Sequence, residues 1–478
     1  MLFSTFDYAL FLPIALLIYW TVRSRGQDGL STLLGLSFIC YGLWNPLEVP
    51  LLVLIVATAF FGGHWIQRSE GRGRSLRMWV LITLLFAPLS YYKYGGFILE
   101  NIAVFMGLVG ESWSPAQLSV GESEGGHLPI GISFFTFQAV AYVVDVAKGM
   151  EVERSFKRFA LFLSFFPQLV AGPIVRAQEL LPQLKQPKWL QRQQVSEGLY
   201  RIAVGFIKKL LIADILGSQM VDSAFVDPAA FSSLELMIAL YAYTLQIYCD
   251  FSGYTDIAIG SGMLFGIKLP ENFRRPYKAT SVAGFWRRWH ITLSLWLRHY
   301  VYFPLGGSHR HTLVVYRNIL ITLIGIGLWH GADYAYVVYG ALHGGAVCLN
   351  RFLKRRGGPD PDDPLPNAWA WFWRFFLTFH FVVLARILFK AGDLDLAWRF
   401  TDSITNLTMT TPRYRLTPWI VMLVGYAIHF SPDRLGLRVK DTFVRSPWWV
   451  QGLALMAIGV ACSLMGTVKD QGFIYFEF

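Results

Sequence analysis

A single histidine stands inside an apolar run of this chain. His330 occupies the sequence Gly325-Ile-Gly-Leu-Trp-His-Gly-Ala332. An ionisable side chain at membrane depth normally faces a protein interior or a water-filled path, so it is a candidate functional residue by default. Loss of water favours the neutral imidazole, which can accept a proton from a hydroxyl and return it to a leaving group. We therefore predict that His330 is a general base, with a purely structural histidine as the alternative.

Polar residues accumulate on both sides of this run, between residues 243 and 343. The stretch 248–256 sets two carboxylates among apolar neighbours, where they need partners. Four arginines follow in 271–277 and 285–290. One prediction is that they line the cytoplasmic mouth of a funnel and bind the phosphate groups of an incoming donor. The alternative is that they pair with Asp250, Asp256 and Glu271, or extend to the lipid headgroups. The predicted catalytic pair is His330 and His290, with His290 or Asp333 orienting His330 or the acyl carbonyl. The predicted binding residues are Asp250, Ser252, Tyr254, Asp256, Asn272, Arg274, Arg275, Arg287, Arg288, Trp329, Asp333 and His343.

Other site chemistries find little support in the spacing. The histidines fit neither a His-x3-His pair on one helical face nor a Cys/His pair, so no metal site is predicted. The sequence Gly-x-Ser-x-Gly of a serine nucleophile is absent. The four cysteines, Cys40, Cys249, Cys348 and Cys462, are interpreted as buried small hydrophobic residues.

The elements that position these residues must be membrane helices. The 478 residues are 54% hydrophobic and 15% charged, against about 25% charged in soluble domains, and the mean hydropathy is +0.43. The first apolar stretch, 8–22, lacks a preceding basic residue and a cleavage pattern, so we expect a retained helix and a mature chain that starts near Met1. The net charge of +11 falls in short inter-helix segments, and taking these as cytoplasmic places both termini outside.

The apolar stretches are irregular in length. About sixteen can be marked, and 97–109, 257–267 and 291–305 fall short of the roughly 20 residues of a crossing. Such stretches predict half-helices or re-entrant segments around an internal funnel, because irregular backbone survives at membrane depth only inside protein or a cavity. Polar linkers are expected at 109–127, 178–197 and 355–367, the last as a subdomain boundary. Gly262-x3-Gly266 and Gly340-x3-Gly344 are candidate helix-packing faces.

Several motifs together resemble the membrane-bound O-acyltransferase family, and within it the bacterial members that O-acetylate polysaccharides such as alginate. They are Leu328-Trp-His-Gly331, Phe285-Trp-Arg-Arg-Trp-His-Ile-Thr-Leu-Ser294, the run 248–260 and Glu271-Asn-Phe-x-x-Pro-Tyr277. Further matches lie at 128–133, 166–174, 205–210 and 473–478, in order along nearly the whole chain.

The resemblance implies an all-α, polytopic membrane protein, with a ring of tilted transmembrane and re-entrant helices around a central funnel. It implies one acyltransferase domain over 1–478, with N-terminal helices at 1–110, a catalytic core at 128–350 and C-terminal helices at 368–478. His330 matches the catalytic histidine of the family, and His290 matches a polar position of the same core.

The resemblance also implies an activity: an acetyl group passes from a cytoplasmic donor, acetyl-CoA, across the bacterial inner membrane to an exported polysaccharide such as alginate or cellulose. No permanently bound cofactor is expected. The expected partner is a separate periplasmic acetyltransferase resembling SGNH hydrolases. Glu477 stands where relatives have Gln. The alternatives are D-alanyl transfer to teichoic acid, a polysaccharide transporter and a non-enzymatic scaffold.

Overall fold

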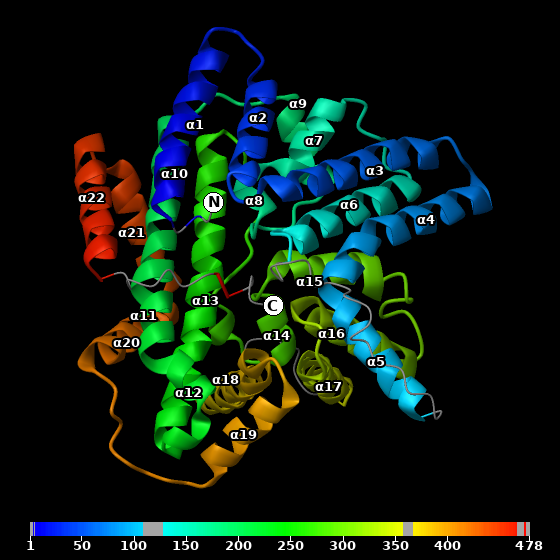
Figure 1. Cartoon of the computed structure of the whole chain (residues 1–478). Coiled ribbons are helices and arrows are strands. Elements are labelled where there is room, and N and C mark those ends of the chain that lie inside the picture. The colour runs from blue at the N-terminus through cyan, green and yellow to red at the C-terminus, as the bar shows by residue number, and fades with distance from the viewer. Residues whose placement is uncertain (1–2, 4, 109–127, 357–366, 466–472, 475–478) are drawn as a thin grey trace. The chain divides into compact units, whose positions relative to one another are not determined.

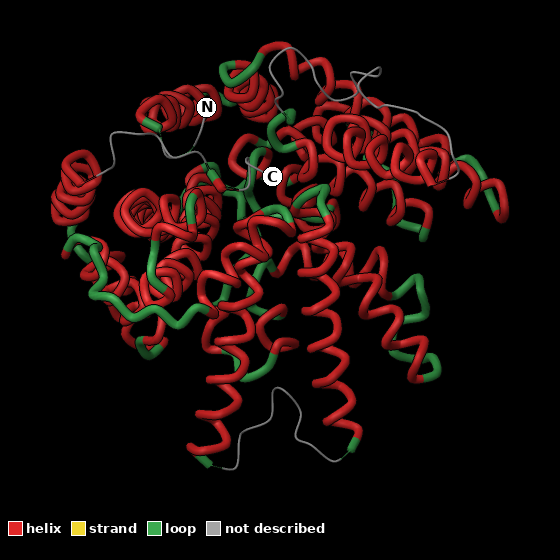
Figure 2. The backbone as a smooth tube through the Cα atoms, turned by 60° about the horizontal axis from the view of Figure 1, so that its bottom comes forward, coloured by secondary structure: helices red, strands yellow, loops and turns green. Residues whose placement is uncertain are grey.

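The chain folds into helices. The computed structural model describes residues 3, 5–108, 128–356, 367–465 and 473–474, and every regular element among them is helical (Figure 2). Within these ranges, five helical segments are long and apolar enough to cross a membrane: Pro46–Gln67, Gly71–Leu108, Thr312–His330, Ala368–Ala391 and Trp448–Met465. The predicted all-α membrane protein is confirmed, while the ring and funnel stay predictions. The predicted linkers at 109–127 and, for the most part, 355–367 lie outside the described residues.

The helices form two compact units. One unit comprises Met1–Leu190 and Ser261–Leu269, and the other comprises Gln191–Gly260 and Pro270–Phe478. These bounds differ from the predicted grouping into 1–110, 128–350 and 368–478. All the predicted site residues belong to the second unit.

The first unit is built around a helix that is buried along nearly its whole length. In α6 every residue from Ile132 to Val146 is buried, and the helix packs against α3 and α4 (Figure 1). The π-helical turn η2 (Ser90–Tyr94) joins α4 to α5 in one continuous run, so the described part of the predicted short stretch 97–109 is the end of a longer helix. The prediction of a helix over 8–22 is confirmed by α1 (Phe6–Ser24). The other helices of this unit are α2 (Gly29–Gly42), α3 (Val49–Gln67), α4 (Gly71–Leu89), α5 (Gly95–Leu108), α6 (Ile132–Ala147), α7 (Phe156–Ser164), α8 (Phe166–Leu169) and α9 (Ala177–Lys185).

The second unit is organised along α13 (Ser233–Leu264), a helix of 32 residues whose last four residues belong to the first unit. The predicted short stretch 257–267 is therefore mostly the end of this helix. The other helices are α10 (Arg192–Phe206), α11 (Asp214–Leu216), α12 (Asp222–Val226), α14 (Val282–Trp286), α15 (Ile291–Leu297), α16 (Thr312–His330), α17 (Tyr334–Arg355), α18 (Ala368–Ala391), α19 (Leu394–Thr405), α20 (Leu416–Phe430), α21 (Asp433–Arg445) and α22 (Trp448–Met465).

Glycines bring α10 and α13 into close contact. A Cβ atom added to Gly205 would lie 2.6 Å from the carbonyl oxygen of Gly253, and one added to Gly260 would lie 2.6 Å from that of Gly198. After Phe206 the helix continues as the π-helical turn η4 (Ile207–Ala213), a distortion that is frequent at functional sites. The close approach and the wider turn let two consecutive lysines of η4 reach carboxylates on α13.

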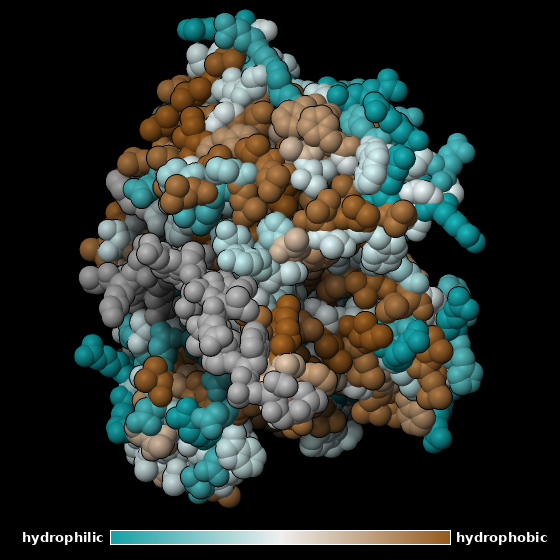
Figure 3. All heavy atoms as spheres, turned by 45° about the vertical axis from the view of Figure 1, so that its right-hand side comes forward, coloured by the Kyte–Doolittle hydropathy of each residue, from teal (hydrophilic) through white to brown (hydrophobic). Residues whose placement is uncertain are grey.

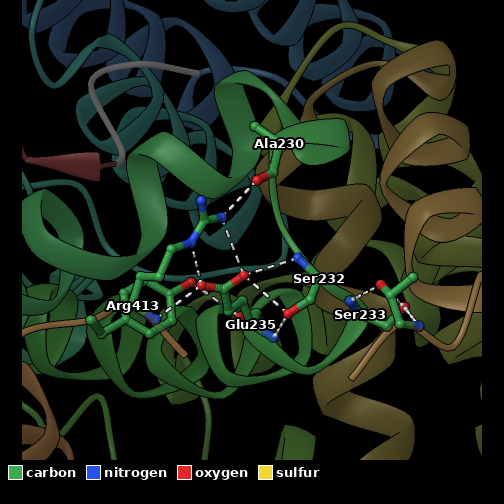
Figure 4. A network of polar contacts seen from close by, with 7 residues as sticks. Ala230, Ser232, Ser233, Glu235 and Arg413 are labelled. Carbon is green, nitrogen blue, oxygen red and sulfur yellow. Dashed lines mark hydrogen bonds and ion pairs between the residues drawn. The ribbon is translucent and has the colours of Figure 1, made fainter. Parts of the chain in front are cut away.

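The start of α13 is fixed by a capping box, the reciprocal pairing of an N-cap serine with a glutamate three residues later. Ser232 donates its backbone N–H to Glu235 Oε2 over 2.9 Å, and its hydroxyl accepts the N–H of Glu235 over 3.3 Å. Arg413, from the loop before α20, donates to Glu235 Oε1 over 3.1 Å and to the carbonyl of Ala230 over 2.7 Å (Figure 4). The network therefore ties the loop before α20 to the first turn of α13.

A second glycine-lined contact joins α16 to α17. A Cβ at Gly340 would lie 2.5 Å from the carbonyl oxygen of Leu323, and one at Gly344 would lie 3.0 Å from the Leu320 side chain. The predicted packing face at Gly340 and Gly344 is thus confirmed. The prediction for Gly266 is wrong, because this glycine follows the end of α13 and takes a left-handed φ of 79°.

Apolar side chains cover much of the surface, as a lipid environment requires. Trp369 of α18, Leu423 of α20 and Trp448 of α22 are 67%, 64% and 78% exposed. Figure 3 shows hydrophobic side chains over much of the face in view. Buried positions in α13 meanwhile carry aspartate, serine, threonine and glutamine. Polar residues inside and apolar residues outside are typical of a membrane protein whose interior does chemistry.

Candidate functional site

Asp250 of α13 lies in a buried ion cluster. Its Oδ1 is 2.8 Å from Lys209 Nζ, and the same ammonium is 2.7 Å from Asp214 Oδ1. Its Oδ2 accepts the backbone N–H of Ile474 over 3.0 Å. One carboxylate therefore joins η4, α13 and the C-terminal segment of the chain. Position 477, noted for its departure from relatives, lies outside the described residues.

The next aspartate on the same helix forms a second cluster. Asp256 pairs with Arg201 over 2.7 Å and with Lys208 over 2.6 Å, and Arg201 also pairs with Glu271. The ion partners of Asp250 and Asp256 are thus Arg201, Lys208 and Lys209. The interpretation that Arg274, Arg275, Arg287 or Arg288 neutralises these two aspartates is wrong, because α10 and η4 approach α13 closely enough for their own cations to do so.

Two more predicted residues of α13 are buried beside these clusters. Ser252 is 2% exposed. Tyr254 stacks on Phe473, with ring centroids 4.5 Å apart, and Phe473 also lies 5.5 Å from Phe251. The described part of the C-terminal segment is thereby packed into the core of the second unit.

Two loop segments, 272–274 and 288–292, run alongside each other and place His290. Arg274 donates its N–H to the carbonyl of Arg288 and Ile291 donates to that of Asn272, both over 2.9 Å. His290 takes a left-handed φ of 42°, a conformation that costs on the order of 1–3 kcal/mol outside glycine. Its side chain is fully buried, and burial lowers the pKa of His290 to about 3, so the ring is neutral near pH 7.

His330 is the last residue of α16 and is 1% exposed. Its ring lies 4.9 Å from that of Trp329 and 4.8 Å from that of Phe389 on α18. Trp329 also contacts His290, with centroids 5.3 Å apart. The structure therefore brings the two predicted catalytic histidines to one indole ring, in a buried environment that includes the Phe389 ring.

The remaining polar residues near α17 have local partners. Asp333 is the N-cap of α17 and accepts the N–H of Ala335 over 2.7 Å. His343 is fully buried, and its Nδ1 accepts the indole N–H of Trp286 over 3.2 Å. These contacts give Asp333 and His343 structural roles, and a further role in binding stays a prediction.

The four predicted arginines differ in their exposure and in the contacts that the structure shows for them. Arg275 donates to the carbonyl of Ser431 and pairs with Asp433 over 3.0 Å, at the junction of α20 and α21. Lys278 reaches the same two residues. Arg274 and Arg287 are exposed and Arg288 is half-buried. A role in binding phosphates stays a prediction for all four.

Sequence reasoning missed a fully buried arginine. Arg386 of α18 is 0% exposed; its guanidinium lies 4.3 Å from the centre of the Trp289 ring and 5.3 Å from that of Phe389. Arg386 Nη1 is 3.5 Å from the hydroxyl of Tyr339. The signal was present, because one cation inside an apolar membrane helix marks a functional position. Lys209 was also missed, although its motif was noted.

Metal chemistry gains no candidate from the geometry. Within the described ranges, no three His, Cys, Asp or Glu side chains gather as ligands would. All four cysteines are free; Cys40 and Cys249 are buried as predicted, whereas Cys348 and Cys462 are partly exposed.

Comparison with known proteins identifies the family. The model of the membrane-bound O-acyltransferase family matches residues 41–357. The peptidoglycan O-acetyltransferase of Helicobacter pylori is 34% identical over 441 residues, which are 85% of this chain and 80% of that protein. The probable alginate O-acetylase AlgI of Pseudomonas aeruginosa is 35% identical over 406 residues, 83% of this chain and 73% of that protein.

A more distant relative matches a smaller part. The teichoic acid D-alanyltransferase of Bacillus subtilis is 28% identical over 274 residues, 55% of this chain and 68% of that protein. The family match covers more than half of the chain, and the two O-acetylating relatives match it over most of their own length. The chain therefore belongs to the membrane-bound O-acyltransferase family and is a multi-pass membrane O-acyltransferase.

Proposed function

We propose that this enzyme takes an acetyl group from cytoplasmic acetyl-CoA and passes it across the bacterial inner membrane for the O-acetylation of an exported polysaccharide such as alginate, cellulose or peptidoglycan. The observation that carries the proposal is the placement of His330, which is buried against Trp329 and Phe389 at the end of α16. The relatives from Helicobacter pylori and Pseudomonas aeruginosa, a peptidoglycan O-acetyltransferase and a probable alginate O-acetylase, support acetyl as the group and a polysaccharide as the acceptor.

In the proposed reaction His330 is the general base. A neutral imidazole nitrogen takes the proton of the acceptor hydroxyl while that oxygen attacks the thioester carbonyl. The tetrahedral intermediate then releases the thiolate, and the imidazolium returns the proton to the sulfur. A dry aromatic environment supports the step, because it favours the neutral base and excludes water that would hydrolyse the thioester.

The donor side of the site is assigned to the basic residues. The exposed Arg274 and Arg287 and the half-buried Arg288 are the candidates for binding the phosphates of the donor. Arg275 is held by Asp433 and Ser431, so its proposed contribution is to shape this surface. The expected partner, a periplasmic acetyltransferase resembling SGNH hydrolases, would complete transfer to the polymer, and both termini are proposed to be periplasmic.

Purified protein in nanodiscs tests the donor and the base together. We expect the wild-type protein to release free CoA from acetyl-CoA in the presence of a glycan acceptor and the proposed periplasmic partner, and His330→Ala to lower that rate by about 10²–10⁴-fold. A transporter or scaffold would release no CoA. Equal rates for the two proteins at matched amounts would contradict the assignment of His330.

The second candidate function is D-alanyl transfer, favoured by the similarity to the teichoic acid D-alanyltransferase of Bacillus subtilis. The same nanodisc assay discriminates between them. Turnover of a carrier-protein D-alanyl thioester, with no turnover of acetyl-CoA, would replace the first proposal with the second.

A further inference from the structure

The side-chain oxygen of Asn272 is the meeting point of three polar groups. Asn272 Oδ1 lies 3.2 Å from the backbone nitrogen of Thr292, 2.9 Å from the Thr292 hydroxyl and 3.2 Å from His290 Nδ1. Both Asn272 and His290 are fully buried. All three contacts therefore form inside the protein, where each polar atom must be matched by a partner of the opposite kind.

These contacts determine which nitrogen of His290 carries the proton. The backbone N–H of Thr292 can only donate, so the Asn272 atom facing it is the carbonyl oxygen and not the amide nitrogen. An oxygen of this kind can only accept, so His290 Nδ1 must donate to it. A neutral imidazole has one N–H, and His290 Nε2 consequently carries the lone pair.

The backbone holds this arrangement rigidly. The bond from Ile291 N to the carbonyl of Asn272 and the bond from Arg274 N to that of Arg288 lie on either side of the pair. The left-handed φ of 42° at His290 is maintained by the same two loop segments. The ring itself packs between Phe251, at 4.7 Å, and Trp329, at 5.3 Å. Rotation of the imidazole is thus opposed from both sides.

We propose that Asn272 is a positioning residue that fixes His290 as the Nδ1–H tautomer, so that Nε2 accepts a hydrogen bond from an O–H or N–H group of the ligand beside His330. The inference rests on the proposed function, which makes the surroundings of His330 the acyl-transfer site. Two ligand groups have the required chemistry: the sugar hydroxyl of the acceptor and the amide N–H groups of the acyl donor. Asn272, predicted from sequence as a residue that touches the donor, then acts through His290 instead.

The charged and titratable side chains around Asn272 and His290 must stay unchanged in any variant used as a test. From α16, His330 lies next to Trp329, which contacts His290. From α18, Arg386 lies over Trp289, the residue before His290. From α13 and η4, Asp250 and Lys209 form their ion pair beside Phe251. None of these side chains is altered in the variants below.

Nitrogen NMR tests the tautomer without any catalysis. The wild-type protein is labelled with ¹⁵N-histidine in nanodiscs, and the signals of His290 are identified by their loss in His290→Gln. The inference expects a protonated Nδ1 and an unprotonated Nε2 near pH 7. A protonated Nε2 would overturn it, even if the protein transfers acetyl groups. Failure of the wild-type protein to use acetyl-CoA would instead overturn the proposed function and leave this measurement interpretable.

A charge substitution tests the role in turnover. In Asn272→Asp a carboxylate oxygen accepts the same three bonds, but its negative charge favours the imidazolium, whose Nε2 carries a proton and cannot accept. We expect the acid limb of the pH–rate profile to shift upward by at least one unit, so that activity is lost at acid pH values where the wild-type protein is still active and recovers as pH rises. Thr292→Val is the matched control: it removes one donor from the same oxygen and should keep the wild-type profile.

The outcomes separate positioning from a structural role. Loss of activity by the same factor at every pH, or an unchanged profile in Asn272→Asp, would overturn the inference. A raised KM for acetyl-CoA in Asn272→Asp would support it and identify the donor amide as the ligand group. An unchanged KM for acetyl-CoA with slower transfer to the glycan would support it and identify the acceptor hydroxyl.

Discussion

Lys209 and Asp250 form an ion pair over 2.8 Å in which the two side chains are 2% and 1% exposed. The pair joins η4 to α13, and through Asp250 it also holds the backbone of Ile474. Removal of one member of a buried pair leaves the other charge without compensation, which typically costs 3–5 kcal/mol. The helix that carries both predicted aspartates thus depends on a lysine of η4, an element that precedes it in the chain.

Lys209→Met should lower the free energy of unfolding by about 3–5 kcal/mol, because Asp214 and Asp250 would remain buried and negative. Thermal unfolding in a constant detergent measures the loss. The control is Lys157→Met, which breaks the exposed pair with Asp28, whose side chains are 44% and 50% exposed, and should cost under about 1 kcal/mol. Equal losses in the two variants would contradict this prediction.

The capping network of α13 should respond to acid. Burial alone would raise the pKa of Glu235, but hydrogen bonds from Arg413 and from the Ser232 and Arg413 backbone outweigh it and lower this pKa to about 2, from an ordinary value of 4.5. A lowered pKa in the folded state means that the stabilisation is complete above about pH 4.5 and is lost as pH falls toward 2.

Glu235→Gln removes that titration and tests the prediction. Its unfolding temperature should lie below that of the wild-type protein near neutral pH, because the amide cannot accept the same charge-assisted bonds. The difference should shrink as pH falls from 4.5 toward 2, because the Glu235 carboxylate of the unfolded chain takes up a proton in this range while that of the folded protein keeps its charge until about pH 2. A difference that stays constant from pH 7 to pH 3 would refute the role assigned to the network.

The contact of α16 with α17 should control the position of His330. Gly340→Ala places a Cβ atom 2.5 Å from the carbonyl oxygen of Leu323 and 2.7 Å from Cα of Ile324, so the helices must separate. We expect acyl transfer to fall at least tenfold and the unfolding temperature to drop. Gly345→Ala is the matched control, since a Cβ there meets nothing within 4 Å. Wild-type transfer rates in Gly340→Ala would show that the contact tolerates the change.

The sequence predicted the functional region for a physical reason that the structure supports. A histidine and two aspartates among apolar residues cannot be left facing lipid, so His330, Asp250 and Asp256 had to be buried inside the protein, the two aspartates beside cations. The helical class followed from the same composition, because backbone polar groups in a bilayer must be satisfied within helices or closed barrels.

The partners themselves could not be predicted from the sequence. Lys209 reaches Asp250 because a π-helical turn and the facing glycines Gly205 and Gly253 bring two helices together, and the π-helical turn has no periodic signature in the sequence. The contact of Asn272 with His290 depends on two loop segments lying side by side. Helix lengths were also misjudged where a π-helical turn continues a helix, as at Ser90–Tyr94.

The most direct test of the account is the acetyl content of the polysaccharide exported by the host, measured with the wild-type chain and with His330→Ala at equal membrane abundance. The account predicts that acetylation is lost in the variant while the protein still inserts and accumulates. Unchanged acetylation at matched protein levels would contradict it, and would make His330 a structural residue or the measured polymer a substrate of another enzyme.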